Sequence, residues 1–240
     1  MRYFIHLAYD GTRFHGWQIQ PGSITVEGEI ERCLSTLLRT DIDIIGAGRT
    51  DAGVHARHMA AHFDYEELDC EQLTYRLNKM LPPDITIYKI ERVSDDIHAR
   101  FSATSRTYHY YVSLRKSPFN RQYTWRTHYA LDFKQMNRAA ALLLEYKDFA
   151  CFCKSHTDVK TTLCNVTEAK WIEKDGDWYF RITANRFLRN MVRAVVGTLI
   201  EVGRNRMTLE EFRQVIEGKK RSQAGESMPG NALFLENVEY

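Results

Sequence analysis

Apolar and polar positions alternate with two different periods along the first hundred residues of the chain. Strand-like alternation of β-forming side chains comes first, and apolar residues then recur at spacings of three and four after Thr25, whose hydroxyl can cap a helix. A second helix is predicted over about 69–80, before Pro82 and Pro83. The predicted strands cover 2–9, 42–47, 58–65 and 84–93. The resulting order, β-α-β-β-α-β, is the ferredoxin-like plan.

The same order of elements repeats in the second half. Asp175-Gly176 is a strong hairpin-turn signal between two strand-like runs. Glycines are expected to end two helices, at Gly203 and Gly218. The predicted elements are a strand at 105–114, a helix at 132–146, a hairpin at 162–185, helices at 186–202 and 208–218, and a strand at 232–240.

These elements predict an α+β fold. We expect two ferredoxin-like halves, residues 1–103 and 104–240, that form a mixed, mainly antiparallel sheet with helices on one side and a central cleft. The two halves share the order of their elements and no sequence identity.

Composition is that of an ordinary globular protein. The chain has 240 residues, of which 44% are hydrophobic and 27% charged. No apolar run approaches the roughly 18 residues of a membrane span, and the first ten residues lack the apolar core of a signal peptide. We therefore expect a cytoplasmic protein that does not insert into a membrane.

Five cysteines, an odd number scattered along the chain, indicate reduced thiols. Three of them gather with His156 in the segment 151–164, namely Cys151, Cys153 and Cys164. A zinc site usually has paired C-x-x-C ligands, whereas this segment begins with C-x-C and ends with a single cysteine. We expect core and loop cysteines and no metal.

The net charge is only +2, so the chain is not a globally basic nucleic-acid binder. Basic residues nevertheless gather locally, for example Arg186, Arg189 and Arg193. Such a face suits a phosphate-backbone partner, although basic residues on solvated helix faces would give the same pattern.

The segment GAGRTDAGVHA, residues 46–56, surrounds Asp51 with glycine and alanine. It lacks the Gly-Lys-Ser/Thr of a phosphate-binding loop and leads to a strand, unlike a dinucleotide fingerprint. Asp51 could simply cap a turn, but small neighbours would also let a substrate approach its carboxylate, which could act as nucleophile or base. A cation would keep that carboxylate ionised, and Arg49 and His55 are local candidates.

Three further stretches could serve a functional site. Arg193 is flanked by apolar residues of a predicted helix, where a guanidinium either has an anionic partner or covers apolar neighbours with its stem. Tyr108 and Tyr110 share one strand face, so one face is core and the other could stack on a base. The turn 9–20 carries donors and a ring suited to RNA, although Trp17 could equally be a packed anchor: Arg13, His15, Trp17 and Gln18.

Four motifs follow one another along the chain: YDGTRFHGWQ, GAGRTDAGVHA, ARFSATSRTYHYY and NRFLRNMVRAVVG. In identity and order they resemble those of the tRNA pseudouridine synthase A family, over nearly the whole chain. GRTDAGVHA is the most specific of them. The fold that this resemblance implies, two ferredoxin-like halves with a central cleft, agrees with the repeated order of elements.

The resemblance also implies roles for particular residues. Asp51 would be the nucleophile, Tyr108 would contact the target base, and Arg193 would pair with the aspartate. Arg49 would help to hold the flipped nucleotide. The other expected RNA contacts are Arg13, Gln18, Arg186 and Arg189. Family members isomerise uridines on the 3′ side of the tRNA anticodon stem-loop, act as homodimers and need no cofactor.

Three alternatives remain open from the sequence. The chain could be a non-catalytic RNA-binding module, since such modules also place aromatic side chains on an open sheet face. It could be an enzyme that binds a nucleotide through GAGRTDAG, or a pseudouridine synthase with another RNA target. Whether the aspartate attacks the sugar, attacks the base or removes a sugar proton also stays open.

Overall fold

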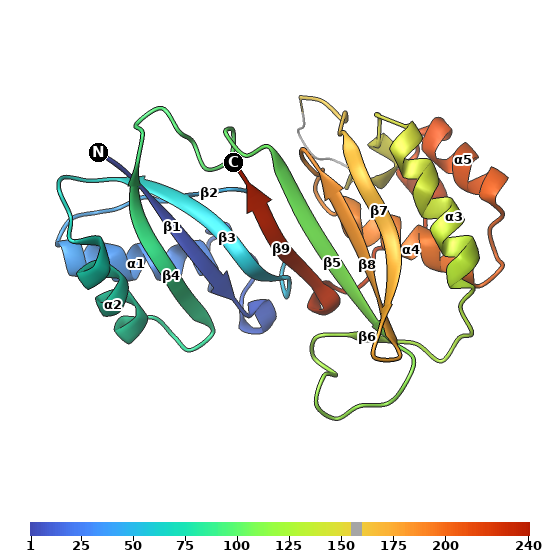
Figure 1. Cartoon of the computed structure of the whole chain (residues 1–240), viewed down its shortest axis with the longest axis horizontal. Coiled ribbons are helices and arrows are strands. Elements are labelled where there is room, and N and C mark those ends of the chain that lie inside the picture. The colour runs from blue at the N-terminus through green and yellow to red at the C-terminus, as the bar shows by residue number, and fades with distance from the viewer. Residues whose placement is uncertain (155–159) are drawn as a thin grey trace. The chain divides into compact units, whose positions relative to one another are not determined.

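The computed structural model describes residues 1–154 and 160–240 (Figure 1). By its contacts the chain divides into two compact units. Unit 1 comprises residues 1–104 together with 234–240, and unit 2 comprises residues 105–233. The fold is α+β, as predicted: most of its described strand pairs are antiparallel, while β9 pairs with β3 and β6 with β5 in parallel.

The sheet of unit 1 is built around strand β1, which pairs antiparallel on both sides. Its strand order is β4-β1-β3-β9. β2 pairs antiparallel with β3, and β9 pairs with β3 in parallel. The strands are β1 (Arg2–Tyr9), β2 (Ile45–Gly46), β3 (His55–Asp64), β4 (Ile85–Val93) and β9 (Leu233–Glu239).

Alternation along β1 produces the core of unit 1. Tyr3, Ile5 and Leu7 point to one face and are at most 2% exposed. Helices α1 (Val26–Leu38) and α2 (Cys70–Met80) each bury an apolar stripe. Their first turns are capped by the side chains of Thr25 and Asp69.

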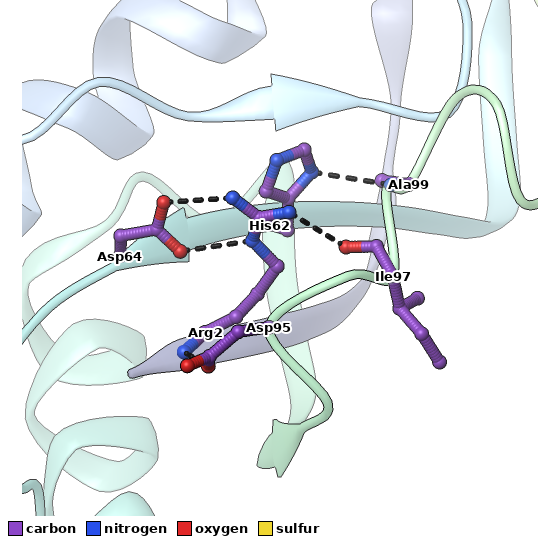
Figure 2. A network of polar contacts seen from close by, with 6 residues as sticks. All are labelled: Arg2, His62, Asp64, Asp95, Ile97 and Ala99. Carbon is purple, nitrogen blue, oxygen red and sulfur yellow. Dashed lines mark hydrogen bonds and ion pairs between the residues drawn. The ribbon is translucent and has the colours of Figure 1, made fainter.

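A polar network ties the connection after β4 to the sheet of unit 1, as Figure 2 shows. The Arg2 guanidinium donates to both carboxylate oxygens of Asp64, at 2.9 and 2.8 Å, and to the carbonyl of Ile97 at 2.9 Å. His62 Nδ1 accepts the Ala99 N–H at 3.2 Å. Burial is the main cause that lowers the pKa of His62 to about 4, and the charge of Arg2 adds to it.

The described residues of unit 2 form three long strands in antiparallel order and three helices. β8 (Asp177–Ala184) lies between β5 (Ser105–Ser113) and β7 (Val166–Lys174), and the short β6 (Trp125–Arg126) runs parallel to β5. The helices are α3 (Phe133–Leu142), α4 (Met191–Gly203) and α5 (Leu209–Gly218). α3 packs against α4 and β7.

Most of α4 is buried, which explains its near-continuous apolar sequence. On the sheet, Tyr110 and Val112 face the core with Phe180 and Ile182, all four fully buried. Fully burying each large apolar side chain contributes about 1.5–3 kcal/mol relative to leaving it exposed.

Several sequence predictions are confirmed. The first strand spans 2–9, Thr25 caps a helix, and Asp175-Gly176 forms the hairpin turn with φ of 55° and 82°. Both residues have positive φ, as the common two-residue turn with matching twist requires.

Other predicted boundaries are wrong. The helix predicted over 186–202 begins at Met191, because Asn190 takes a left-handed conformation with φ of 66° that interrupts it. The run 42–47 forms a strand only at Ile45–Gly46. By contrast, the predicted end of α5 at Gly218 is confirmed, and the residue after it, Lys219 with φ of 55°, takes the left-handed cap conformation.

The last strand is grouped with unit 1, where His55 is opposite Phe234 in the parallel pair. Our expectation placed it in the C-terminal half. The division into halves 1–103 and 104–240, and the central cleft, stay predictions. No helix of the described residues is long and apolar enough to span a bilayer.

Candidate active site

The loop that carries Asp51 is fixed by its neighbours on both sides. Ala47 N–H donates to the Ala60 carbonyl of β3 at 2.8 Å, which continues the β2–β3 pairing. Thr50 is held twice, by the Trp17 N–H at its carbonyl (3.3 Å) and by the Tyr9 hydroxyl at its Oγ1 (2.9 Å). The loop therefore presents residue 51 from a defined backbone.

Two glycines allow this close packing. A Cβ on Gly16, whose φ is +89°, would lie 2.2 Å from the Thr50 carbonyl oxygen. A Cβ on Gly46 would lie 2.6 Å from the ring of Trp17. A side chain at position 16 would displace the backbone beside Asp51, and one at position 46 would displace the Trp17 ring.

Asp51 itself is half-buried, and Arg49 two residues before it is exposed. A bond from the Val54 N–H to the Asp51 carbonyl, at 3.2 Å, closes a turn that begins at Asp51. Asp51 is thus neither enclosed in the core nor fully in solvent, which suits a group that must meet a substrate.

His55 is only 1% exposed and begins β3. Its ring stacks on Phe234 at 4.4 Å, and its Nδ1 lies 3.0 Å from the Gly11 nitrogen and 3.1 Å from Asp10 Oδ1. Nδ1 cannot accept from Gly11 and donate to Asp10 at once. The buried Gly11 N–H needs an acceptor, which Nδ1 supplies, while Asp10 Oδ1 also accepts from the Thr12 N–H.

The turn 9–20 divides its side chains between core and surface. Trp17 is 2% exposed, so it is a packed anchor. Its Nε1 donates to Glu27 at 3.0 Å. Burial raises the pKa of Glu27, opposed by this bond and by the charge of Arg49. Arg13 pairs with Asp84, and Gln18 is exposed.

In unit 2, Tyr108 is half-buried and meets Phe187 edge to face, with ring centroids 5.1 Å apart. It shares its strand face with the fully buried Tyr110, whose pKa is raised by burial. Tyr111 is on the other face of β5. It pairs with Tyr179 of β8, and the centroids of the two rings are 5.7 Å apart. The predicted alternation of these tyrosines is confirmed.

Arg193, in the first turn of α4, is tied to the segment 224–228. Its Nε donates to the Met228 carbonyl at 2.5 Å, and the Met228 N–H donates back to the Arg193 carbonyl at 3.1 Å. The close approach depends on Gly197, where a Cβ would lie 1.8 Å from the Glu226 carbonyl oxygen. The guanidinium is therefore oriented by backbone groups of unit 2.

The other two arginines of this region do not lie on the helix. Arg186 is half-buried and donates to the Thr161 carbonyl at 3.4 Å, while Arg189 is exposed in the turn before α4. The helix predicted over 186–202 would have carried both of them with Arg193, but α4 begins only after Asn190. Their contact with RNA stays a prediction.

The three cysteines of the segment 151–164 are buried and free. Burial raises the pKa of Cys151 to about 12 and that of Cys164 to about 11. His156 lies outside the described residues. Within residues 1–154 and 160–240, no group of three potential ligands is arranged to hold a metal ion.

Comparison with known proteins decides the family. The model of the family described as tRNA pseudouridine synthase matches residues 5–102 and 139–240. The chain belongs to this tRNA pseudouridine synthase family. A member from Bacteroides thetaiotaomicron, named tRNA pseudouridine synthase A, is 58% identical over 243 residues, which cover 100% of this chain and 90% of that protein.

More distant synthases give the same result. A relative of the same name from Parabacteroides distasonis is 55% identical, covering 100% of this chain and 96% of its own. A relative of the same name from Bacillus subtilis is 38% identical, and the match covers 100% of this chain and 99% of that protein. The resemblance based on four motifs is therefore confirmed along the whole chain.

Two supports of the site were missed from the sequence. Tyr9 was placed on a strand, but nothing indicated its bond to Thr50, 41 residues away. Met228, whose carbonyl orients Arg193, offers only a backbone group, which leaves no signature in residue type.

Proposed function

We propose that this chain forms pseudouridine on the 3′ side of the tRNA anticodon stem-loop, with Asp51 as the nucleophile. The coarser statement, an isomerase that forms pseudouridine in tRNA, follows from family membership. One observation best supports the assignment of Asp51. This half-buried residue follows Thr50, which is hydrogen-bonded to both Tyr9 and Trp17.

The reaction needs one well-placed carboxylate. The bond between N1 of uracil and C1′ of ribose breaks, the uracil turns, and C5 forms the new bond to C1′. The proton lost from C5 is balanced by the one gained at N1, and nothing is oxidised or reduced. Asp51 can serve by attack on the sugar, by attack on the base or by removal of a sugar proton, and these three routes share the ionised carboxylate.

The remaining candidates would hold the RNA and the aspartate. We assign contact with the flipped base to Tyr108, and pairing with the Asp51 carboxylate to Arg193. Arg49 would hold the extruded nucleotide, because flipping a stacked base costs about a few kcal/mol. The candidates for backbone contacts are Arg13, Gln18, Arg186 and Arg189. By resemblance, the active form would be a homodimer.

The Asp51→Asn variant tests the central assignment. The amide has the size of the carboxylate and lacks its charge, so the variant should bind tRNA within about threefold of the native affinity and lose at least about a thousandfold in rate. Pseudouridine mapping of bulk tRNA after incubation with each protein measures the products. Appreciable turnover by Asp51→Asn would refute the nucleophile, whereas binding without turnover by the native chain would indicate an RNA-binding module.

Arg193 is tested by a matched pair of substitutions. Lys keeps the positive charge but cannot reproduce the Nε bond to Met228, and Ala removes both. We expect Arg193→Lys to retain more activity than Arg193→Ala, with Asp51→Asn as the inactive reference. An unchanged rate constant in Arg193→Ala, measured in single turnovers, would remove the pairing with Asp51.

A further inference from the structure

Residues 114–131 of unit 2 form a basic segment that none of the roles above uses. It holds four Lys and Arg residues and no Asp or Glu, within a chain of net charge +2. The segment lies between residues 5–102 and 139–240, the two parts of the chain that the family model matches. Its basic residues are Arg115, Lys116, Arg121 and Arg126.

All four basic side chains are exposed. The ion pairs of unit 2 gather on other acidic residues, namely Glu145, Asp148, Glu168 and Glu201. Among the described residues, none of the four takes part in an ion pair with a carboxylate. Without them, 29 Lys and Arg would face 31 Asp and Glu, so the segment reverses the sign of the net charge. Exposed cations without carboxylate partners keep their full attraction for an external anion.

The segment is held at both ends and along its length. Leu114 N–H donates to Asp177 at 3.3 Å, and Thr127 N–H donates to the Ser113 carbonyl at 3.1 Å. Between these anchors, β6 pairs with β5, and Asn231 donates to the Gln122 carbonyl at 3.3 Å. Figure 1 shows the intervening chain leaving the end of β5 as a projecting loop.

Arg115 has a fixed place at the base of this loop. Its guanidinium donates to the Asp175 carbonyl at 3.2 Å and lies over Gly176, where a Cβ would be 1.9 Å from Nη2. Phe119, four residues after Arg115, is 83% exposed. Cations interleaved with an exposed ring are the combination that binds RNA phosphates and stacks on an unpaired base.

We propose that residues 114–131 form a second RNA contact, in which the four cations bind the phosphate backbone of the tRNA substrate and Phe119 stacks on an unpaired base. The inference rests on the proposed function for its substrate, but it concerns affinity and not the chemical step. The four side chains neutralise phosphates, so their contribution must weaken as salt rises.

Matched variants of equal charge test the proposal. In the loop variant, Arg115, Lys116, Arg121 and Arg126 are each changed to Gln. In the control variant, Arg76, Lys79, Lys134 and Arg138, which are exposed on helices α2 and α3, are changed to Gln. Filter binding measures the dissociation constant for tRNA over a range of salt, and single turnovers at saturating enzyme measure the rate constant.

We expect the loop variant to bind tRNA at least about tenfold more weakly near physiological salt, and its log–log salt slope to fall by about 3, because each phosphate contact contributes roughly 0.7–0.9. Its saturated rate constant should match that of the control. Phe119→Ala should weaken binding about fivefold or more without changing the salt slope.

Equal weakening in the loop and control variants would overturn the proposal, since net charge alone would then explain the loss. Unchanged binding in the loop variant would overturn it as well. Failure of the native chain to form pseudouridine would instead count against the proposed function. The comparison of tRNA affinities would still test the second RNA contact, because it does not depend on turnover.

Discussion

At the scale of single residues, the ring of Tyr108 and its hydroxyl can be separated. The ring already packs edge to face on Phe187. If the ring is what contacts the target base, Tyr108→Phe should keep most of the single-turnover rate, whereas Tyr108→Ala should lose about ten- to a hundredfold. Equal rates for both variants and the native chain would remove Tyr108 from the site.

His62 predicts a pH dependence of stability. Its folded pKa is about 4, below the ordinary value of 6.5, because the ring is buried and lies near the charges of Arg2 and His98. Asp64, which Figure 2 shows bonded to Arg2, partly opposes the shift. Between pH 6.5 and about 4, His62 is protonated in the unfolded state but stays neutral in the folded state. The free energy of unfolding should therefore fall by about 3 kcal/mol as the pH drops from 6.5 to about 4.

The His62→Asn variant isolates this contribution. Its amide oxygen can accept the Ala99 N–H in place of Nδ1, and it does not titrate. Urea unfolding at several pH values should give a shallower slope between pH 6.5 and 4 for His62→Asn than for the native chain. Parallel slopes in the two proteins would assign the acid sensitivity to other groups.

Asp51 could be selected from the sequence because residue types carry its signal: small neighbours, one carboxylate and a nearby arginine. The supports of the site could not be selected in this way. The bond of Tyr9 to Thr50 and that of Arg193 to the Met228 carbonyl join distant segments, and a backbone acceptor is available in any residue.

At the scale of elements, α4 shows why boundaries are harder to predict than the elements themselves. Its apolar stripe predicted a helix correctly, and its end at Gly203 is confirmed. Its start was wrong because the stripe already begins at Leu188, which is buried just before the helix. The apolar pattern therefore starts before Asn190, although the left-handed φ of Asn190 keeps the helix from starting before Met191.

Gly197 tests how α4 and the segment 224–228 depend on each other. Replacing a glycine within a helix by alanine usually stabilises by about 0.5–1 kcal/mol. Here a Cβ would lie 1.8 Å from the Glu226 carbonyl oxygen, so the backbone of the segment must move. We expect Gly197→Ala to destabilise by about 1–3 kcal/mol and to lower activity, because Met228 would no longer orient Arg193.

Gly218→Ala in α5 is the matched control. Its Cβ would meet the Oε1 atom of Gln223, the far end of a flexible side chain, which can turn away. In thermal unfolding, the free energy of unfolding of this variant should lie within about 1 kcal/mol of that of the native chain. If Gly197→Ala also proves neutral, the close packing of the segment on α4 does not matter for stability.

At the scale of the whole molecule, strand order depends on pairs that local patterns do not specify. The final strand was predicted, but its parallel pairing with β3 was not, and Arg57 and Glu236 of this pair are 179 residues apart. Local periodicity fixes which face of a strand is apolar. It does not fix which strand lies beside it, because that choice depends on the packing of the whole unit.

The chain and its RNA should suffice for the reaction. Pseudouridine formation breaks one bond and makes another with no net oxidation. The raised pKa values of Cys151, about 12, and Cys164, about 11, keep these thiols protonated at neutral pH, whereas zinc binds the thiolate. After treatment with a chelator and its removal, the protein should hold substoichiometric zinc and keep its single-turnover rate. A loss of rate restored by one equivalent of zinc would instead give the metal a role, and Cys151, Cys153 and Cys164 would be its first candidate ligands.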